Sequence, residues 1–179
     1  MGNLVEKLKN FFSSSNMEIV MIGIENSGKT TILNQLSLGE ASVTAPTIGL
    51  NVKQFKKGGV KMKMWDIGGQ TQYRPEWGLY TRGVNAILFV VDSANRDTLS
   101  ISKRELHTLL EDSELSNIPI LVIGNKVDIQ GHMNEQEIIQ GMNLDYITSN
   151  PWVVVMVSAL RGDNIPAIVD WLVKKSKKQ

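Results

Sequence analysis

The residues best suited to chemistry in this sequence form a glycine-rich stretch that ends in a lysine and a threonine. Residues 23–30 read GIENSGKT and match the pattern G-x-x-x-x-G-K-[ST], with an apolar run before them and a helical pattern after them. In that context glycine lets backbone N–H groups surround phosphate oxygens, and the helix N-terminus adds its dipole. We therefore predict that Lys29 reaches the β- and γ-phosphates of a nucleotide and that the Thr30 hydroxyl binds Mg²⁺. A chance match in a glycine-containing turn is the alternative. The predicted phosphate-binding residues are Glu25, Asn26, Ser27, Gly28, Lys29, Thr30 and Thr31.

A second group of residues, Trp65–Gln70, lies where an expected strand ends. An Asp that leaves a strand beside a phosphate loop can hold the shell of a Mg²⁺ ion, so Asp66 is predicted to bind the metal through water. The Gly68 N–H is predicted to donate to a γ-phosphate, and Gly69 is predicted to bind nucleotide too. Gln70 is predicted to orient an attacking water and, with Lys29, to be catalytic. On its own, D-x-x-G is also consistent with a surface turn.

A third group follows two later apolar runs and is suited to reading a base. Residues 125–128 read NKVD, and a carboxylate at Asp128 can accept two hydrogen bonds from the N1–H and N2–H₂ edge of guanine. Adenine lacks these paired donors, so Asp128 would select GTP over ATP. The backbone of residues 158–160 is placed to approach the guanine O6. The alternative interpretation of N-K-x-D is a charged loop. The predicted base-site residues are Asn125, Lys126, Asp128, Ser158, Ala159 and Leu160.

Composition limits the classes of protein that could carry these residues. The chain has 179 residues, 19 Lys and Arg against 18 Asp and Glu, and 42% apolar residues, which is typical of one globular domain. A net charge of +1 disfavours a dedicated nucleic-acid binder. The absence of cysteine and the presence of only two histidines disfavour a structural zinc site. No apolar run reaches the roughly 18 residues of a spanning helix, so we expect any membrane contact to be peripheral.

The elements expected to position these residues alternate between apolar runs and helical patterns, which favours a mostly parallel sheet covered on both faces. The runs of strand character are 17–23, 50–56, 60–66, 86–91, 118–124 and 152–157. The helical patterns are 29–38, 98–111, 134–142 and 165–174. The runs 50–56 and 60–66 flank Gly58-Gly59, which predicts a β-hairpin. We therefore expect an α/β fold of the P-loop NTPase kind, with six strands and one antiparallel edge strand.

Together these motifs resemble the Ras-superfamily small GTPases and, within them, the Arf/Arf-like group. The pieces most typical of the group are residues 46–51 (PTIGLN), residues 65–70 (WDIGGQ), and Arg74 with Trp77 and Tyr80. Residues 82–87 and 105–110 look most like the lysosome-associated Arf-like branch. The resemblance covers nearly the whole chain. It implies a switch that binds and hydrolyses GTP with Mg²⁺, and that acts through an exchange factor, a GTPase-activating protein and effectors.

The resemblance also implies roles that spacing does not show. Thr47 would bind Mg²⁺ and the γ-phosphate in the GTP state, Lys126 would pack over the guanine, and Asn125 would brace the loops around it. Leu50, Trp65 and Tyr80 would face effectors, although ordinary core packing is an alternative for the two aromatic residues. The group also slides the β-hairpin when the N-terminal helix is released.

Two departures from the group bear on function. Leu50 replaces the usual Phe of the effector-facing surface, which leaves the choice of partner open. Glu25 stands where the group commonly has Asp. A carboxylate at this position would lie near the γ-phosphate, and the two negative charges would repel each other. We therefore predict slow intrinsic hydrolysis. We also expect a partner to supply the arginine finger, because the chain has no obvious one of its own.

The N-terminal residues predict a short amphipathic helix before Ser13-Ser14-Ser15. It either packs permanently on the domain or binds a membrane surface when GTP releases it. Gly2 is a candidate for myristoylation, although Glu6 stands where that pattern has Ser or Thr. The lysines near the C-terminus suggest a solvated helix end, with membrane attraction secondary. The apolar side of the helix comprises Leu4, Val5, Leu8, Phe11 and Phe12.

The sequence thus predicts an N-terminal helix and linker (1–16), a GTPase domain (17–179), and a monomeric switch in vesicle or organelle traffic. We expect it in the cytoplasm, cycling to a lysosomal, late endosomal or Golgi membrane. Two alternatives stay open. A metabolic P-loop kinase is disfavoured because the chain has no arginine-rich lid and carries N-K-x-D. A constitutively nucleotide-bound scaffold would keep the site but hydrolyse GTP negligibly.

Overall fold

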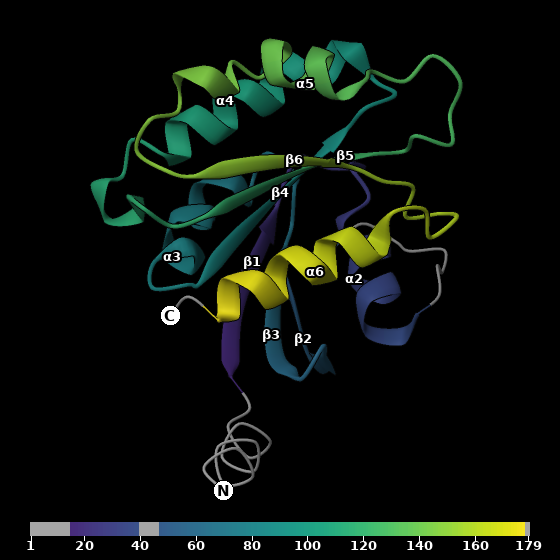
Figure 1. Cartoon of the computed structure of the whole chain (residues 1–179). Coiled ribbons are helices and arrows are strands. Elements are labelled where there is room, and N and C mark those ends of the chain that lie inside the picture. The colour runs from purple at the N-terminus through teal and green to yellow at the C-terminus, as the bar shows by residue number, and fades with distance from the viewer. Residues whose placement is uncertain (1–14, 40–46, 178–179) are drawn as a thin grey trace, which may run out of the picture.

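The computed structural model describes residues 15–39 and 47–177, and these form a central sheet with helices on both faces (Figure 1). Within them, six strands follow the order β2-β3-β1-β4-β5-β6. Only β2, at one edge, runs antiparallel to its neighbour. The strands are β1 (Asn16–Ile22), β2 (Leu50–Lys57), β3 (Val60–Ile67), β4 (Ala86–Asp92), β5 (Ile120–Asn125) and β6 (Trp152–Met156).

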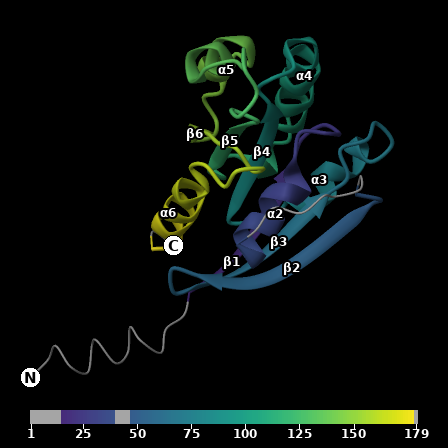
Figure 2. The same ribbon diagram turned by 90° about the vertical axis from the view of Figure 1, so that its right-hand side faces the viewer.

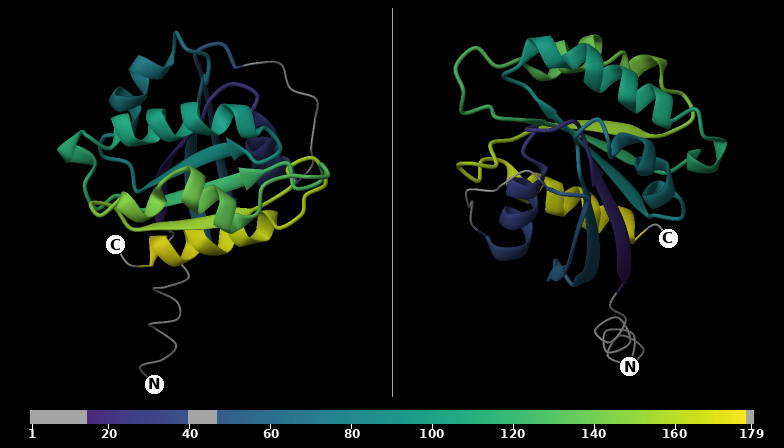
Figure 3. Two further views of the ribbon diagram at one scale, coloured as in Figure 1. Left: turned by 90° about the horizontal axis from the view of Figure 1, so that it is seen from above. Right: turned by 180° about the vertical axis from the view of Figure 1, so that it is seen from behind.

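Helices from the described residues cover the sheet in two layers. On one face lie α2 (Lys29–Leu38) and α6 (Ile165–Ser176). The other face is covered by α3 (Trp77–Thr81), α4 (Leu99–Leu109) and α5 (Glu135–Gly141). Figure 3 shows α4 and α5 side by side over the strands. No helix in the described ranges is both long and apolar enough to span a bilayer.

Each face of the sheet has its own apolar core, because successive side chains of a strand point to opposite faces. In β1, Met17, Ile19 and Met21 pack with α2 and α6. Val20 and Ile22 pack with α3, α4 and α5. All five side chains are buried. Such two-sided burial explains the nearly continuous apolar runs, and it fixes the register that brings the carboxyl ends of β1, β4 and β5 to one edge.

The hairpin of β2 and β3 forms the outer edge of the sheet (Figure 2). Its two-residue turn is Gly58-Gly59, with φ of 56° and 78°. A turn with positive φ at both central residues matches the twist of the flanking strands. The hairpin predicted from the Gly-Gly pair is therefore confirmed, together with the six-stranded, mostly parallel sheet.

The expected elements agree with the structure to within a few residues, with two informative differences. The expected helix 134–142 begins at Glu135, because Asn134 and Glu137 form a capping box. The expected strand 118–124 begins at Ile120, because Pro119 has no N–H and the Ile118 N–H donates to Leu115 in the preceding turn. The sequence did not predict α3, whose five residues show too little periodicity.

Candidate functional site

The phosphate loop connects β1 to α2, and Lys29 is the first residue of the helix. The Lys29 Nζ donates to the carbonyl oxygens of Gly23 at 2.9 Å and Ile24 at 3.0 Å, which folds the side chain across the loop. Burial lowers the pKa of the Lys29 ammonium to about 8, against the opposing charges of Asp66 and Glu25. A buried cation held by two backbone carbonyls beside a helix N-terminus is suited to receive an anion, which is the role predicted for Lys29.

Gly28, like Gly23 earlier in the loop, is a position where a side chain cannot be accommodated. Its φ is 95°, and a Cβ there would lie 2.1 Å from the side-chain Nδ2 of Asn125. Asn26, which has a φ of 61°, supplies a second left-handed residue. The second glycine of the motif therefore does two things: it lets the chain turn into α2, and it lets β5 approach.

Three oxygen-bearing side chains meet beside the lysine. The Thr30 hydroxyl donates to Asp66 Oδ2 at 2.6 Å, and the Thr47 hydroxyl lies 2.8 Å from that of Thr30 and 3.3 Å from the same carboxylate oxygen. Asp66 is fully buried, and burial raises its pKa. Its other oxygen, Oδ1, has no hydrogen-bond partner among the described residues.

This donor set fits Mg²⁺, which prefers oxygen ligands, keeps several waters and is usually bound by one or two carboxylates. No cluster of three or more His, Asp or Glu side chains suited to a metal occurs within the described part of the chain. The structure thus brings one carboxylate and two hydroxyls together, and the metal-binding roles of Asp66, Thr30 and Thr47 stay a prediction.

The segment after Asp66 lies directly on the phosphate loop. The Gly69 carbonyl accepts from the Glu25 N–H at 3.1 Å, and a Cβ on Gly69 would lie 2.4–2.5 Å from the backbone of residues 23–25. The Gly68 N–H donates to the Gly49 carbonyl at 2.8 Å. That bond occupies the donor which the sequence assigned to a γ-phosphate, so the expectation for Gly68 is not met here. Gln70 follows, half-buried.

The loops at the ends of β5 and β6 are tied to the phosphate loop by two residues of the NKVD motif. Asn125 donates to the Ser27 carbonyl at 2.9 Å and accepts from the Ala159 N–H at 3.0 Å. The Lys126 ammonium contacts the Asn26 carbonyl at 2.6 Å and forms an ion pair with Asp92. The two Asn125 bonds join loops that the resemblance expects this residue to brace around the base.

Asp128 is oriented by a hydrogen bond from Ser158, whose hydroxyl donates to Asp128 Oδ1 at 2.6 Å. The same hydroxyl accepts from the Arg161 N–H at 3.1 Å. Next to Ser158, Ala159 is buried and Leu160 is 68% exposed. Ser158 therefore positions the side chain predicted to read guanine, a role that its place in the sequence did not reveal.

An apolar surface lies on the outer face of the hairpin, at the end nearest the phosphate loop. Trp65 and Tyr80 have ring centroids 6.1 Å apart, and both are half-buried against the core. Leu50 is 38% exposed. Nearby in the sequence, Ile48 and Leu79 are 84% and 73% exposed. The two aromatic residues thus combine core packing with partial exposure, and their role toward effectors stays a prediction.

Sequence reasoning gave no role to Trp77 and Arg74, which hold the segment after Asp66. Trp77 is buried, packs edge-on against Phe89 with centroids 6.3 Å apart, and donates from Nε1 to the Gly68 carbonyl at 3.1 Å. Arg74 donates from Nε to the Gly69 carbonyl at 3.0 Å. Both were recognised only as residues typical of the group; their partners could not be read from local spacing.

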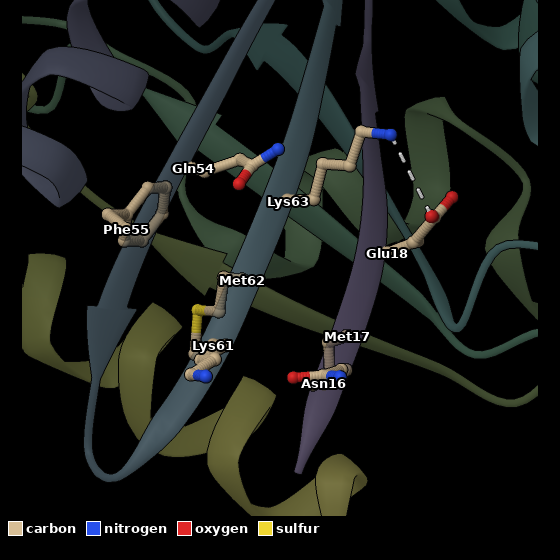
Figure 4. A pocket seen from close by; sticks show the side chains of 8 residues that line it. All are labelled: Asn16, Met17, Glu18, Gln54, Phe55, Lys61, Met62 and Lys63. Carbon is tan, nitrogen blue, oxygen red and sulfur yellow. Dashed lines mark ion pairs between the residues drawn. The ribbon is translucent and has the colours of Figure 1, made fainter. Parts of the chain in front are cut away.

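A surface hollow of about 510 Å³ lies away from this site, near the hairpin turn (Figure 4). Its walls come from the start of β1 and from β2 and β3, with Lys63 paired to Glu18 at 3.9 Å along one side. None of the predicted nucleotide-binding residues lines it. The hollow is therefore separate from the candidate nucleotide site.

A parallel sheet with a lysine-bearing phosphate loop, a buried Asp–Thr cluster and an NKVD loop defines a GTP-binding P-loop switch protein. The comparisons narrow the class. The sequence pattern described as "ADP-ribosylation factor family" matches residues 3–176, and the chain belongs to that family. It is accordingly an Arf-family small GTPase that binds and hydrolyses GTP.

Similar proteins agree with this assignment. The chain is 41% identical over 175 residues to ADP-ribosylation factor-like protein 8b of Arabidopsis thaliana. The matched region covers 97% of this chain and 95% of that protein. It is 38% identical over 176 residues to protein 8c of the same plant, covering 98% and 96%. The structure of the Arl6 BBS3 small GTPase from Trypanosoma brucei, with the nucleotide analogue GppNp bound, superposes with a TM-score of 0.84 at 30% identity, covering 92% and 99%. The predicted resemblance to the Arf-like group and its lysosomal branch is thus confirmed.

Proposed function

We propose that this GTPase is a Mg²⁺-dependent switch that recruits effectors in its GTP state at an intracellular membrane. The observation that supports this most directly is the meeting of Lys29, Thr30, Thr47 and Asp66. Lys29 and Thr30 begin α2 after the phosphate loop, Thr47 lies in the segment before β2, and Asp66 lies near the end of β3. A γ-phosphate and its metal would join these elements, and hydrolysis would release them.

The chemistry assigned to the site is phosphoryl transfer to water, in which positioning and charge neutralisation lower the barrier. Lys29 would neutralise the β- and γ-phosphates, and Gln70 would orient the attacking water. Thr30 and Thr47 would hold Mg²⁺ directly, and Asp66 through water; the metal would supply charge neutralisation. Because the Gly68 N–H is already bonded, Gly69 is the better candidate for the γ-phosphate contact.

Guanine recognition is assigned to the loops at the ends of β5 and β6. Asp128 would accept from the N1–H and N2–H₂ groups, and its orientation by Ser158 supports this role. Lys126 would pack its stem over the base. The backbone of Ala159 and Leu160 would approach O6. Ser27, Asn26, Gly28 and Thr31 would line the phosphate side.

Effectors would bind the apolar surface of Leu50, Trp65 and Tyr80. This surface lies at the end of the hairpin where β2 begins, just after Thr47, and where β3 ends, just after Asp66. A change in those residues would therefore alter the surface directly. An exchange factor would release GDP, and a GTPase-activating protein would supply the missing arginine. We expect the GTPase to act as a monomer, and not on nucleic acid.

The membrane contact is assigned to residues 1–16, with the GTPase domain at 17–179. The predicted amphipathic helix and Gly2 lie outside the described residues. The place where residues 1–16 join the domain supports this assignment. There the Ser15 carbonyl accepts from the Lys61 N–H at 3.0 Å, beside the hairpin turn. The turn also meets α6, because a Cβ on Gly58 would lie 2.5 Å from Val173 Cγ2.

Lysines gather around this junction. Lys56 and Lys61 of the hairpin and Lys174 and Lys177 near the C-terminus are exposed. Lysines near an anionic leaflet each contribute about 1 kcal/mol of attraction. One myristoyl chain on Gly2 binds membranes only marginally, so the helix and these lysines would supply the second signal. Lysosomal, late endosomal or Golgi membranes are the proposed destinations.

The proposal is tested by sedimenting the natively expressed full chain with anionic liposomes after loading with GDP or a non-hydrolysable GTP analogue. We expect enrichment with the analogue only. Equal partition in the two states would separate membrane attachment from the nucleotide switch. The variant Gln70→Leu, assayed for stimulated hydrolysis, checks the catalytic assignment: it should stay in the GTP state, and unchanged hydrolysis would argue for another water-positioning residue. Negligible hydrolysis by the wild type even with activator would favour the scaffold.

A further inference from the structure

Arg74 is the residue that fastens the segment after Asp66 to the rest of the domain. Its side chain is only 9% exposed, which is unusual for arginine. It donates to three separate parts of the chain: to the Gly69 carbonyl at 3.0 Å, to Glu25 Oε2 at 2.9 Å and to Glu105 Oε1 at 3.3 Å. A planar guanidinium can hold several acceptors in fixed directions at once, whereas a lysine ammonium is a point charge.

These bonds close a ring around the contact between Gly69 and the phosphate loop. The Gly69 carbonyl accepts from both the Arg74 Nε and the Glu25 backbone N–H, while the Glu25 carboxylate accepts from the other end of the same guanidinium. Glu105, on α4, holds the guanidinium from the core side, with its side chain 19% exposed. The ring cannot close unless Gly69 lies on the loop.

Charge gives this arrangement a second consequence. Glu25 sits in the phosphate loop, and the charges of both Glu25 and Arg74 act on the pKa of Lys29. The guanidinium therefore lies close enough to offset the Glu25 carboxylate where a γ-phosphate would bind. The expectation of slow hydrolysis considered the Glu25 carboxylate without a partner. In the structure this carboxylate is paired with Arg74.

We infer that Arg74 is a positioning residue for GTP hydrolysis: by pairing with Glu25 it fastens Gly69 and Gln70 to the phosphate loop and removes the repulsion between Glu25 and the γ-phosphate. Because each of its three nitrogens already donates within the chain, we assign Arg74 to positioning and leave contact with the transferred phosphoryl group to a partner's arginine. The inference rests on the proposed roles of Gln70 and Gly69, and it adds a partner pair that the motifs did not indicate.

The test is a double-mutant cycle in the full chain with Arg74→Gln, Glu25→Gln and both together. Two quantities are measured: the ratio of GTP to GDP affinity by competition against a fluorescent GDP, and single-turnover hydrolysis with Mg²⁺. Arg74→Gln leaves an unpaired carboxylate, so the affinity ratio should fall about tenfold. Removing Glu25 as well should restore most of that ratio, whereas the hydrolysis rate should stay low because the ring is open. The inference would be overturned if the effect of the double variant on the affinity ratio equalled the sum of the effects of Arg74→Gln and Glu25→Gln, expressed as free energies.

Arg74→Lys separates charge from geometry. It should keep the wild-type affinity ratio, because the positive charge remains, but hydrolyse GTP about tenfold more slowly, because an ammonium cannot bridge three acceptors. Equal rates for Arg74→Lys and wild type would also overturn the inference. This variant decides the matter if Arg74→Gln fails to fold by circular dichroism.

Arg82→Gln is the matched control. Arg82 also pairs with two carboxylates, Asp112 at 3.0 Å and Glu114 at 3.2 Å, but its side chain is 53% exposed and none of its ion-pair partners belongs to the phosphate loop. It should behave as wild type in both assays. A wild type that neither prefers guanine nucleotides nor hydrolyses GTP would instead show that the proposed function has failed.

Discussion

The side-chain amide of Asn125 donates to the carbonyl oxygen of Ser27 at 2.9 Å, although the two residues are 98 positions apart in the chain. The same side chain accepts from Ala159 beyond β6. One buried amide thus joins the phosphate loop to both base-side loops. The halves of the nucleotide site are therefore expected to lose their alignment together if this amide is removed.

Asn125→Ala should weaken GDP and GTP binding by a similar factor, since both nucleotides span the joined loops. Each buried partner left without a hydrogen bond costs about 1–3 kcal/mol, so we expect a loss of at least tenfold in affinity. Fluorescent nucleotide dissociation measures it. Gln130→Ala, which removes an exposed side-chain amide just after the NKVD motif, is the control. An affinity unchanged in Asn125→Ala would contradict the bracing role.

Ser158→Ala should weaken guanine nucleotide binding without creating ATP binding. The variant loses the hydroxyl that orients Asp128, and one hydrogen bond to a charged group contributes about 1.5–3 kcal/mol. We expect an affinity for GDP roughly tenfold lower in isothermal titration. If Asp128 reads guanine without help from Ser158, the variant will bind GDP as the wild type does.

Gly69→Ala should block the contact between Gly69 and the phosphate loop. The added Cβ would meet backbone atoms of residues 23–25 at 2.4–2.5 Å, and backbone cannot rotate away as a side chain can. We expect near-normal GDP binding but a loss of the GTP-specific gain in thermal stability, measured by scanning fluorimetry. Gly78→Ala, where a Cβ would meet nothing within 4 Å, is the control. A normal response to GTP in Gly69→Ala would mean that the contact forms no part of the switch.

Trp77→Phe should keep the fold but loosen the segment after Asp66. It retains an aromatic ring against Phe89 and removes the Nε1–H that bonds the Gly68 carbonyl, at a cost of about 1–3 kcal/mol. We expect a lower midpoint in urea and slower single-turnover hydrolysis. A variant that is less stable yet hydrolyses GTP normally would limit Trp77 to packing.

Glu137→Gln should be less stable than wild type at pH 7, and the difference should vanish in acid. The backbone N–H of Asn134, with Arg96, lowers the Glu137 pKa below its ordinary value near 4.5. A carboxyl with a lowered pKa in the folded state stabilises above its unfolded pKa and loses that effect as the pH falls through the folded pKa. Urea midpoints from pH 7 down to pH about 3 measure the difference. Glu135→Gln, which leaves the capping box intact, should show the smaller pH dependence; equal curves would contradict the assignment.

Local patterns predicted the elements that carry the phosphate and base motifs. The bounds of α2 agreed with the prediction because glycine, lysine and the apolar spacing of 29–38 all lie within one short window. The Gly58-Gly59 turn was predictable for the same reason. Contacts between distant segments were not: Arg74 meets Glu105 at a separation of 31 residues and Glu25 at 49.

The error at Gly68 has a similar physical origin. The motif indicated a glycine pair after Asp66, but it carried no information on which acceptor the Gly68 N–H would find. That acceptor, the Gly49 carbonyl, lies at the start of the hairpin and is brought close only by the register of β2 against β3. The sequence patterns therefore predicted which residue types lie at the site. They did not predict which donor bonds to which acceptor there.

The tip of the hairpin lies against α6, with Gly58 facing Val173, while the opposite ends of β2 and β3 lie next to Thr47 and carry Asp66. Eight residues of strand span about 25 Å at roughly 3.3 Å each. The contact at Gly58 is thus expected to restrict the sliding of the ladder along its own axis that the resemblance implies. A bulkier residue at position 58 is therefore expected to change the position of Thr47 and Asp66, the predicted metal-binding residues, from the opposite end of the hairpin.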